Sequence, residues 1–175
     1  MERYMLKMYI LGVAGIFFIG CTSNLVVSTP KGLPPVYEDV NDTYQKKNDI
    51  PVSVFRLQNY TDTPRAGMRA ANIIEGILKA KGYRVISHVH DKKYSLKKAS
   101  KKAKDDGSQY FIYGGVSEWR YKTGIDGEPA VSLQISLYKT KNKKLVWSAT
   151  GSDSDWGNGS IGTTAQSLIL NMMEE

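Results

Sequence analysis

Residues 110–152 read YFIYGGVSEWRYKTGIDGEPAVSLQISLYKTKNKKLVWSATGS and contain three strand-like stretches separated by two turn-like segments. The middle stretch alternates apolar and polar residues, as a half-buried strand does, and its apolar positions are Val131, Leu133, Ile135 and Leu137. Two glycines, Gly114 and Gly115, predict a bend in the first stretch. GIDGEP and KNKK are short enough to be hairpin turns. The region therefore predicts an antiparallel meander of three strands.

Upstream of the meander, strands and helices are predicted to alternate. PVSVFRL (residues 51–57) and YRVISHV (residues 83–89) resemble strands, and between them residues 66–81 carry apolar pairs at helical spacing. Gly82 is placed to end that helix. A lysine-rich helix is predicted over residues 92–106. The alternation predicts strands that are joined by helical crossovers.

Downstream, one more helix is predicted. Its apolar residues share one helical stripe, which consists of Ala165, Leu168, Ile169, Met172 and Met173. Thr163 and Gln166 have the spacing of a capping box at its start. The predicted order is β-α-β-α-β-β-β-α. We therefore predict a single α/β (α+β) domain with a mixed five-stranded sheet and helices packed on it.

Composition allows one domain and excludes several classes of protein. The chain has 175 residues, of which 41% are hydrophobic and 10% are aromatic, which suffices for one core and is too apolar for a disordered chain. Its single cysteine, Cys21, excludes an internal disulfide framework and a cysteine-rich zinc site. The formal net charge of +7 suggests anionic surfaces as partners but carries no information about the fold.

The first 20 residues have the layout of a lipoprotein signal peptide. Arg3 and Lys7 precede an apolar run over residues 8–19, which is too short to span a bilayer comfortably. The run ends in F-I-G-C, which is similar to a bacterial lipobox although Phe18 stands where leucine is usual. We therefore expect Cys21 to be lipidated; an uncleaved anchor or a buried thiol is the alternative. Thr22 follows in place of the aspartate that favours the inner membrane, so we expect an outer-membrane, periplasm-facing protein.

The mature chain is predicted to have two parts. Residues 21–49 contain prolines, polar residues and no periodicity, and are interpreted as the lipidated cysteine and a flexible tether. Residues 50–175 form the predicted domain. Removing the signal peptide takes away Arg3, Lys7 and Glu2 and lowers the net charge from +7 to +6. Nucleic acid is not an expected partner of an exported lipoprotein.

Catalytic and metal-binding patterns are weak in this sequence. His88 and His90 point to the same face of a strand end beside Asp91, but a metal site would need a third ligand from elsewhere, so ordinary strand-end histidines are the favoured interpretation. Asp126 and Glu128 in GIDGEP are a carboxylate pair of the kind that glycan-cleaving enzymes use, although D-G and E-P are also ordinary turn chemistry. We expect no enzyme, no cofactor and no metal.

The lysine-rich segment admits two interpretations. Its lysines surround a narrow stripe formed by Leu96, Ala99 and Ala103. Most runs of this kind are solvated helix faces. The alternative is attraction to anionic headgroups or to an acidic partner surface. The sequence does not separate them.

Three stretches together resemble the PelC family of outer-membrane lipoproteins, which serve Pel exopolysaccharide export. They are NYTDTPRAGMRAANIIEGILKAKG, SEWRYKTGIDGEPAVSLQISLY and VWSATGSDSDW, and the resemblance covers most of residues 51–170. It implies a dodecameric, palmitate-bearing ring in the biofilm export machinery that works with the β-barrel and repeat protein PelB. The ring would guide the cationic, galactosamine-rich Pel polymer toward the pore.

The resemblance also implies roles for individual residues. Asp126 matches the acidic, polymer-receiving face, and Glu128 is added because of its proximity. Trp156, in the polar segment GSDSDWGNGS, matches an aromatic that faces the membrane. The alternative is that Trp156 packs onto the last helix as a hydrophobic staple.

A cationic polymer and a positively charged chain are compatible only if charge is segregated, with acids near the ring opening and the lysine-rich helix elsewhere.

A monomeric periplasmic adaptor or assembly factor is the alternative function, and a glycan hydrolase is a third.

Overall fold

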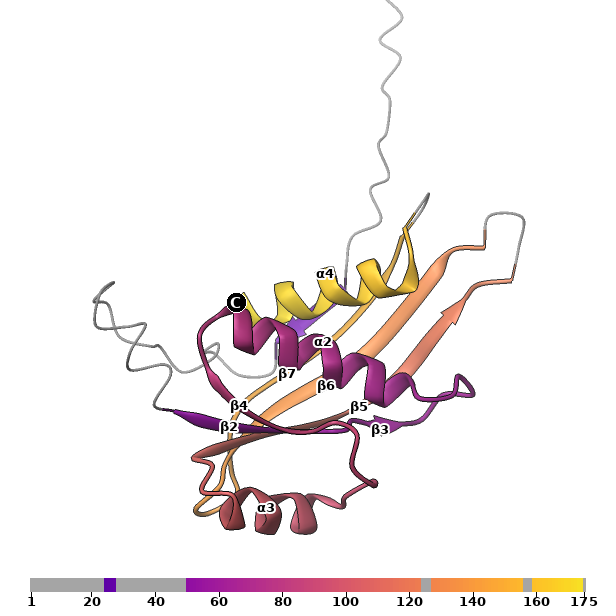
Figure 1. Ribbon diagram of the computed structural model, residues 1–175. Coiled ribbons are helices and arrows are strands. Elements are labelled where there is room, and N and C mark those ends of the chain that lie inside the picture. Colours follow the sequence, from indigo (N-terminus) through magenta and orange to yellow (C-terminus); the bar gives the residue numbers. More distant parts are fainter. Residues whose placement is uncertain (1–23, 28–49, 124–126, 156–158, 175) are drawn as a thin grey trace, which may run out of the picture.

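A computed structural model describes residues 24–27, 50–123, 127–155 and 159–174, and these form one sheet with helices on both faces (Figure 1). The strands are β1 (Asn24–Val27), β2 (Pro51–Phe55), β3 (Gln58–Asn59), β4 (Arg84–His88), β5 (Tyr110–Tyr121), β6 (Pro129–Lys139) and β7 (Lys144–Ser154). The helices are α2 (Ala66–Ala80), α3 (Leu96–Asp105) and α4 (Ile161–Glu174). The predicted fold class, one α/β domain with a mixed sheet, is confirmed.

The strand order is β1-β7-β6-β5-β2-β4, and the short β3 also pairs with β5. β5, β6 and β7 form the predicted antiparallel meander, while β2 is parallel to both β4 and β5. The predicted count of five strands was too low, because two strands were missed. β3 has two residues and β1 has four, which is too short for alternation to reveal.

Strand β1 lies within the segment predicted as the tether. It pairs antiparallel with β7, from Asn24 opposite Ser152 to Val27 opposite Ala149. Backbone pairing requires no particular side chain, and four residues are too few for a clear strand pattern, so this edge strand was not predicted. The proposed boundary between tether and domain at residue 49 stays a prediction.

β5 bends close to the predicted position. Its register with β6 shifts between Val116 and Glu118, just after the two glycines. A side chain at Gly114 would overlap the carbonyl oxygen of Gln134 on β6, so the close approach of the two backbones requires glycine there.

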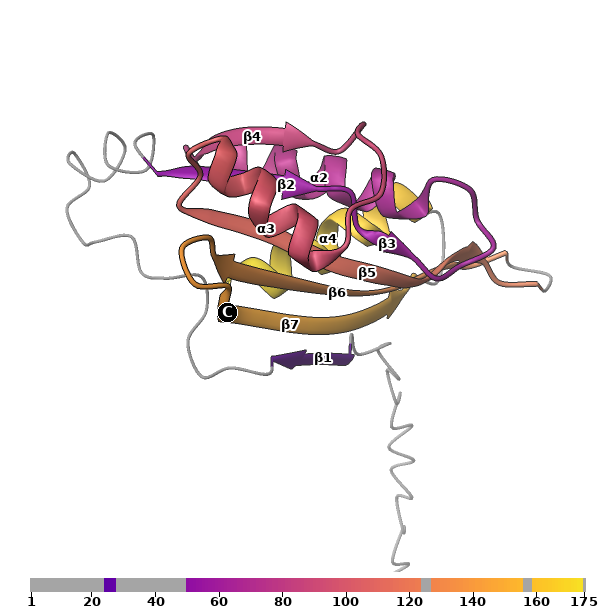
Figure 2. The same ribbon diagram turned by 90° about the horizontal axis from the view of Figure 1, so that it is seen from below.

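The two faces of the sheet are covered differently, with α2 and α4 on one and α3 on the other (Figures 1 and 2). The main core lies under α2 and α4 and includes Trp119 and Trp147, both buried. A smaller cluster under α3 contains Phe55, Phe111, Ala99 and Ala103. Leu96 packs against this cluster, so the apolar stripe predicted for the lysine-rich helix does face the sheet.

The end of α2 agrees with the prediction, whereas the starts of α3 and α4 differ from it. α2 ends as predicted, with Gly82 at a φ of 84° just beyond it. α3 begins at Leu96 rather than at residue 92, so Lys92 and Lys93 precede it. The predicted capping box of α4 was one turn late. Ser160 N–H donates to Thr163 Oγ1 at 2.9 Å and Thr163 N–H donates to Ser160 Oγ at 3.2 Å, so Thr163 takes the third helical position that Glu or Gln usually fills.

His88 fastens α3 to the sheet. Its side chain is buried, its ring stacks on Phe55 with centroids 4.7 Å apart, and both ring nitrogens face carboxylates. Nδ1 lies 2.8 Å from Asp91 Oδ2, and Nε2 lies 2.7 Å from Asp106 Oδ2. Lys102 Nζ donates to Asp106 Oδ1 at 2.6 Å. Together these contacts join β4, the residues just after it and the C-terminal end of α3.

Burial alone would raise the pKa of Asp106, but hydrogen bonds from Lys102 and His88 outweigh burial, and the pKa lies below its ordinary value of 3.8. The stabilisation that Asp106 provides is therefore present above its unfolded-state pKa and is lost as the pH falls through the lower folded-state pKa. Asp106→Asn should reduce the free energy of unfolding near neutral pH by about 1–3 kcal/mol, because charged hydrogen bonds to a part-buried group are lost.

Denaturant unfolding near neutral pH and again below pH 3.8 measures this effect. The difference in free energy of unfolding between wild type and Asp106→Asn should be smaller in acid. Asp105→Asn is the matched control, because that neighbouring side chain is 58% exposed and lies 3.8 Å from Lys101. An equal loss in both variants would show that the His88 contacts do not hold α3.

Two glycines of α2 allow a second prediction. A Cβ at Gly67 would overlap the carbonyl oxygen of Leu57, whereas a Cβ at Gly76 would meet nothing within 4 Å. Gly67→Ala should therefore lower the free energy of unfolding by about 1–3 kcal/mol through overpacking. Gly76→Ala should raise it by up to about 1 kcal/mol, because alanine is the better helix former. Chemical unfolding of both variants measures this, and the same sign for both would contradict the close approach of α2 to the backbone of Leu57.

Candidate functional site at the β5–β6 loop end of the sheet

Two of the loops that carry predicted site residues meet at one end of the sheet. Ala130 at the start of β6 pairs with Ser154 at the end of β7, and Asp155 N–H donates to Pro129 O at 3.3 Å. The β5–β6 hairpin and the β7–α4 connection therefore leave the sheet side by side (Figure 1). Cys21, Asp126 and Trp156 themselves lie outside the described residues.

Glu128 closes the base of the β5–β6 hairpin. It is only 8% exposed, and its Oε2 lies 3.2 Å from Lys122 Nζ. Lys122 N–H also donates to Glu128 O at 2.6 Å, which pairs the two backbone segments. Its negative charge is thus compensated inside the hairpin. The suggested role of Glu128 in attracting polymer stays a prediction, and the geometry favours a role in shaping the loop that carries Asp126.

The described residues on either side of Trp156 are held by hydrogen bonds. Before it, Asp155 is tied to Pro129; after it, Ile161 N–H donates to Tyr121 Oη at 3.3 Å. The Ser160–Thr163 capping pair fixes the start of α4. Tyr121 comes from β5 and is 51% exposed. The β5 strand thus helps to position both loops.

Charges differ between the two ends of β6. At the loop end, Glu118 pairs with Arg120 at 2.9 Å, while Asp153 and Asp155 have no ion-pair partner among the described side chains. At the other end, the β6–β7 turn carries Lys139, Lys141, Lys143 and Lys144. The antiparallel register keeps these lysines a whole strand away from Glu128 and Asp155.

The other candidate residues lie away from this end. His88 belongs to the contact between α3 and the sheet, and the carbonyl of His90 accepts a hydrogen bond from Arg56. Within the described ranges, no group of three or more His, Cys, Asp and Glu side chains could hold a metal ion. Most lysines of the segment that contains α3 are exposed, whereas Lys102 binds Asp106. All helices in the described ranges are too short or too polar to span a bilayer.

Comparison with known structures identifies similar chains. Two solved structures of PelC from Paraburkholderia phytofirmans are each 30% identical to this chain and cover 86% of it and 95% of their own length. One, a single-substitution variant, is a dodecamer in space group C2 with a TM-score of 0.68. The other is a dodecamer in space group P6 with a TM-score of 0.66.

A third structure shares only the fold. The lipoprotein GNA1162 from Neisseria meningitidis has a TM-score of 0.56 at 17% identity, over 72% of this chain and 99% of its own. No family model and no curated protein matches the sequence. Identity of 30% over nearly the full length of PelC establishes the relationship, and the chain therefore belongs to the PelC family.

Proposed function

We propose that this chain is a non-enzymatic, ring-forming outer-membrane lipoprotein that guides cationic Pel polysaccharide toward its export pore. The observation that carries the proposal is its similarity, over 95% of their length, to PelC chains that assemble as dodecamers. PelB is the proposed partner at the pore. Lipidated Cys21 would attach each subunit to the outer membrane, since acyl chains contribute roughly 0.8 kcal/mol per buried methylene.

The distribution of charge supports a guiding role. A polycation passing through a ring is best attracted by many weak carboxylate contacts, since tight binding at one site would stop it. Asp126 is the proposed main contact, and Asp153 and Asp155 lie on the adjacent strand end without ion-pair partners among the described residues. The lysines of the β6–β7 turn occupy the opposite end, where they would not repel the polymer.

The shared loop end also gives Trp156 a place in the proposal. An indole combines an apolar body with a polar N–H and suits the headgroup level of a bilayer. Because the flanks of Trp156 and Asp126 leave the same end of the sheet, the ring would hold acidic residues close to the membrane-facing tryptophans. Twelve weak contacts would then orient the whole ring.

Asp126→Asn should reduce the amount of secreted Pel while leaving ring assembly unchanged, because a carboxylate that attracts the polymer is lost and the new side chain has nearly the same size and shape. The measurement is secreted polymer at equal protein level, together with the mass of the detergent-solubilised assembly. Asp105→Asn is the matched control at an exposed carboxylate on α3. Unchanged secretion in Asp126→Asn, Glu128→Gln and the double variant would refute the role of these carboxylates.

Trp156→Ala should weaken binding of the full chain to lipid vesicles, because each subunit loses an interfacial side chain. Flotation with vesicles of outer-membrane lipid composition measures this, and the loss should be larger for assembled rings than for single subunits. Tyr60→Ala, at a side chain that is 71% exposed, serves as the control. If instead Trp156→Ala lowers thermal stability and leaves flotation unaltered, the indole of Trp156 packs onto α4.

A further inference from the structure

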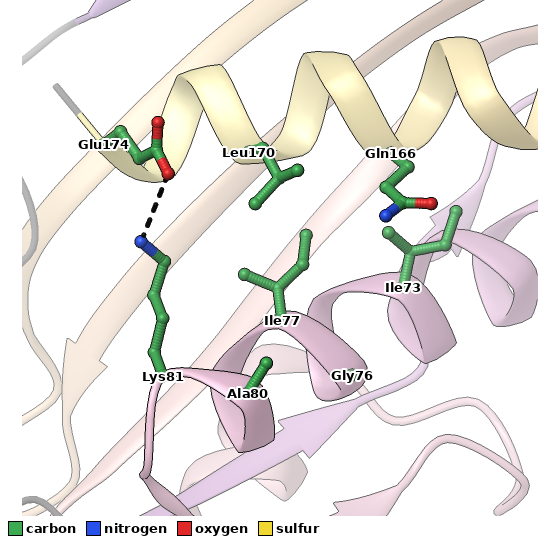
Figure 3. Close-up of a pocket in the computed structure, with 8 residues that line it drawn as sticks. All are labelled: Ile73, Gly76, Ile77, Ala80, Lys81, Gln166, Leu170 and Glu174. Carbon is green, nitrogen blue, oxygen red and sulfur yellow. Dashed lines mark ion pairs between the residues drawn. The ribbon is translucent and has the colours of Figure 1, made fainter.

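A groove runs between α2 and α4 on the outer side of the domain (Figure 3). The space has a volume of about 450 Å³. Ile73, Ile77 and Leu170 give it apolar walls, and Gly76 and Ala80 leave its α2 side open. At one end Lys81 Nζ lies 3.5 Å from Glu174 Oε1. An apolar centre with a charged rim is the usual arrangement of a protein interface.

The groove is not filled by the chain itself. A Cβ at Gly76 would meet nothing within 4 Å, and both Ile73 and Leu170 are only partly buried although they pack on the main core. α2 therefore has room for an incoming side chain at Gly76. An alanine would fit there and would favour the helix, so the helix itself does not require glycine.

The inferred occupant is a second copy of this chain, which rests on the proposed ring. The relatives at 30% identity are dodecamers in two different space groups, so their assembly does not depend on one crystal lattice. A closed ring of identical subunits with cyclic symmetry needs a heterologous contact, in which one patch of a subunit meets a different patch of its neighbour.

We propose that the groove of one copy receives Leu145, the second residue of β7, from the next copy. Three large hydrophobic side chains are exposed among the described residues, and Leu145, at 42%, is the aliphatic one. The other two have contacts within the chain: Tyr121 Oη accepts from Ile161, and the Tyr60 ring lies against Gly115.

Charge also matches across the proposed contact. Lys143 and Lys144 precede Leu145, and Lys143 has a φ of 57° in the turn. On the groove rim, the Glu174 side chain is 60% exposed and has only the long contact to Lys81 among the described ion pairs. Lysines beside the inserted leucine would meet this carboxylate, which favours one direction of docking.

The contact must join two copies, because within one chain the two patches lie on opposite faces of the sheet. Leu145 is the cross-strand partner of Tyr138, and the Tyr138 ring stacks on Phe111 in the cluster under α3. Cross-strand partners share a face. The groove is formed by α2 and α4, which cover the other face (Figures 1 and 3).

Cysteine cross-linking in membranes of cells that make the full chain tests this pairing. The double variant Gly76→Cys with Leu145→Cys should give, on oxidation, a ladder of covalent oligomers, because every subunit carries both halves of the contact. Co-expressed single variants should give dimers only. A ladder from either single variant alone would show that the natural Cys21 contributes. Gly76→Cys with Tyr60→Cys is the matched control and should give no ladder.

Leu145→Ser provides a second readout, since this exposed side chain can be replaced without opening the core. It should shift the detergent-solubilised protein from the ring to single subunits while the melting temperature of the subunit is unchanged. If Leu145→Ser still forms intact rings and the Gly76→Cys/Leu145→Cys double variant gives no ladder, the groove contact is overturned and the proposed function stays in place. Dimers from Gly76→Cys alone would show a face-to-face contact instead. A wild-type chain that is monomeric in membranes would overturn both the groove contact and the proposed ring.

Discussion

The backbone ladder that joins β5, β6 and β7 determines the position of almost everything else in this domain. Its hydrogen bonds run from Tyr110 opposite Lys139 to Tyr121 opposite Pro129, and continue from β6 to the last residue of β7. Because the register is fixed along the whole length of β6, the loops at each end are brought together in space. One end receives the β5–β6 hairpin and the start of α4, and the other receives the lysine-rich turn.

The same ladder separates the two faces. Alternation sends Leu133, Ile135 and Leu137 into the core under α2 and α4, while Tyr138 faces α3. The three helices of the described chain cover the two faces to different extents. α3 is short and lysine-rich, and it depends on a buried histidine held between two carboxylates. α2 and α4 cover the larger core and leave between them a groove with apolar walls.

The fold alone does not define what the protein does. GNA1162 has a similar architecture at only 17% identity, and a shared fold does not by itself imply a shared function. Family membership rests on 30% identity over 86% of this chain, and the resemblance seen in the sequence included stretches that reach into β5 and β6. Sequence pattern located these stretches correctly, because long strands with regular alternation and a helix ended by Gly82 leave strong signals. It misplaced the α4 cap, since Thr163 resembles the first residue of a capping box as well as its last.

The sequence by itself determined the order of the main elements, the meander and the segment that carries each candidate residue, because periodicity and turn residues are local properties. Only the tertiary structure decided that Glu128 is compensated by Lys122, that His88 bridges two carboxylates, and that β1 extends the sheet. It also decided that the flanks of Asp126 and Trp156 share one end of the sheet. These features depend on contacts between residues far apart in the chain, and no local pattern encodes the distance between them.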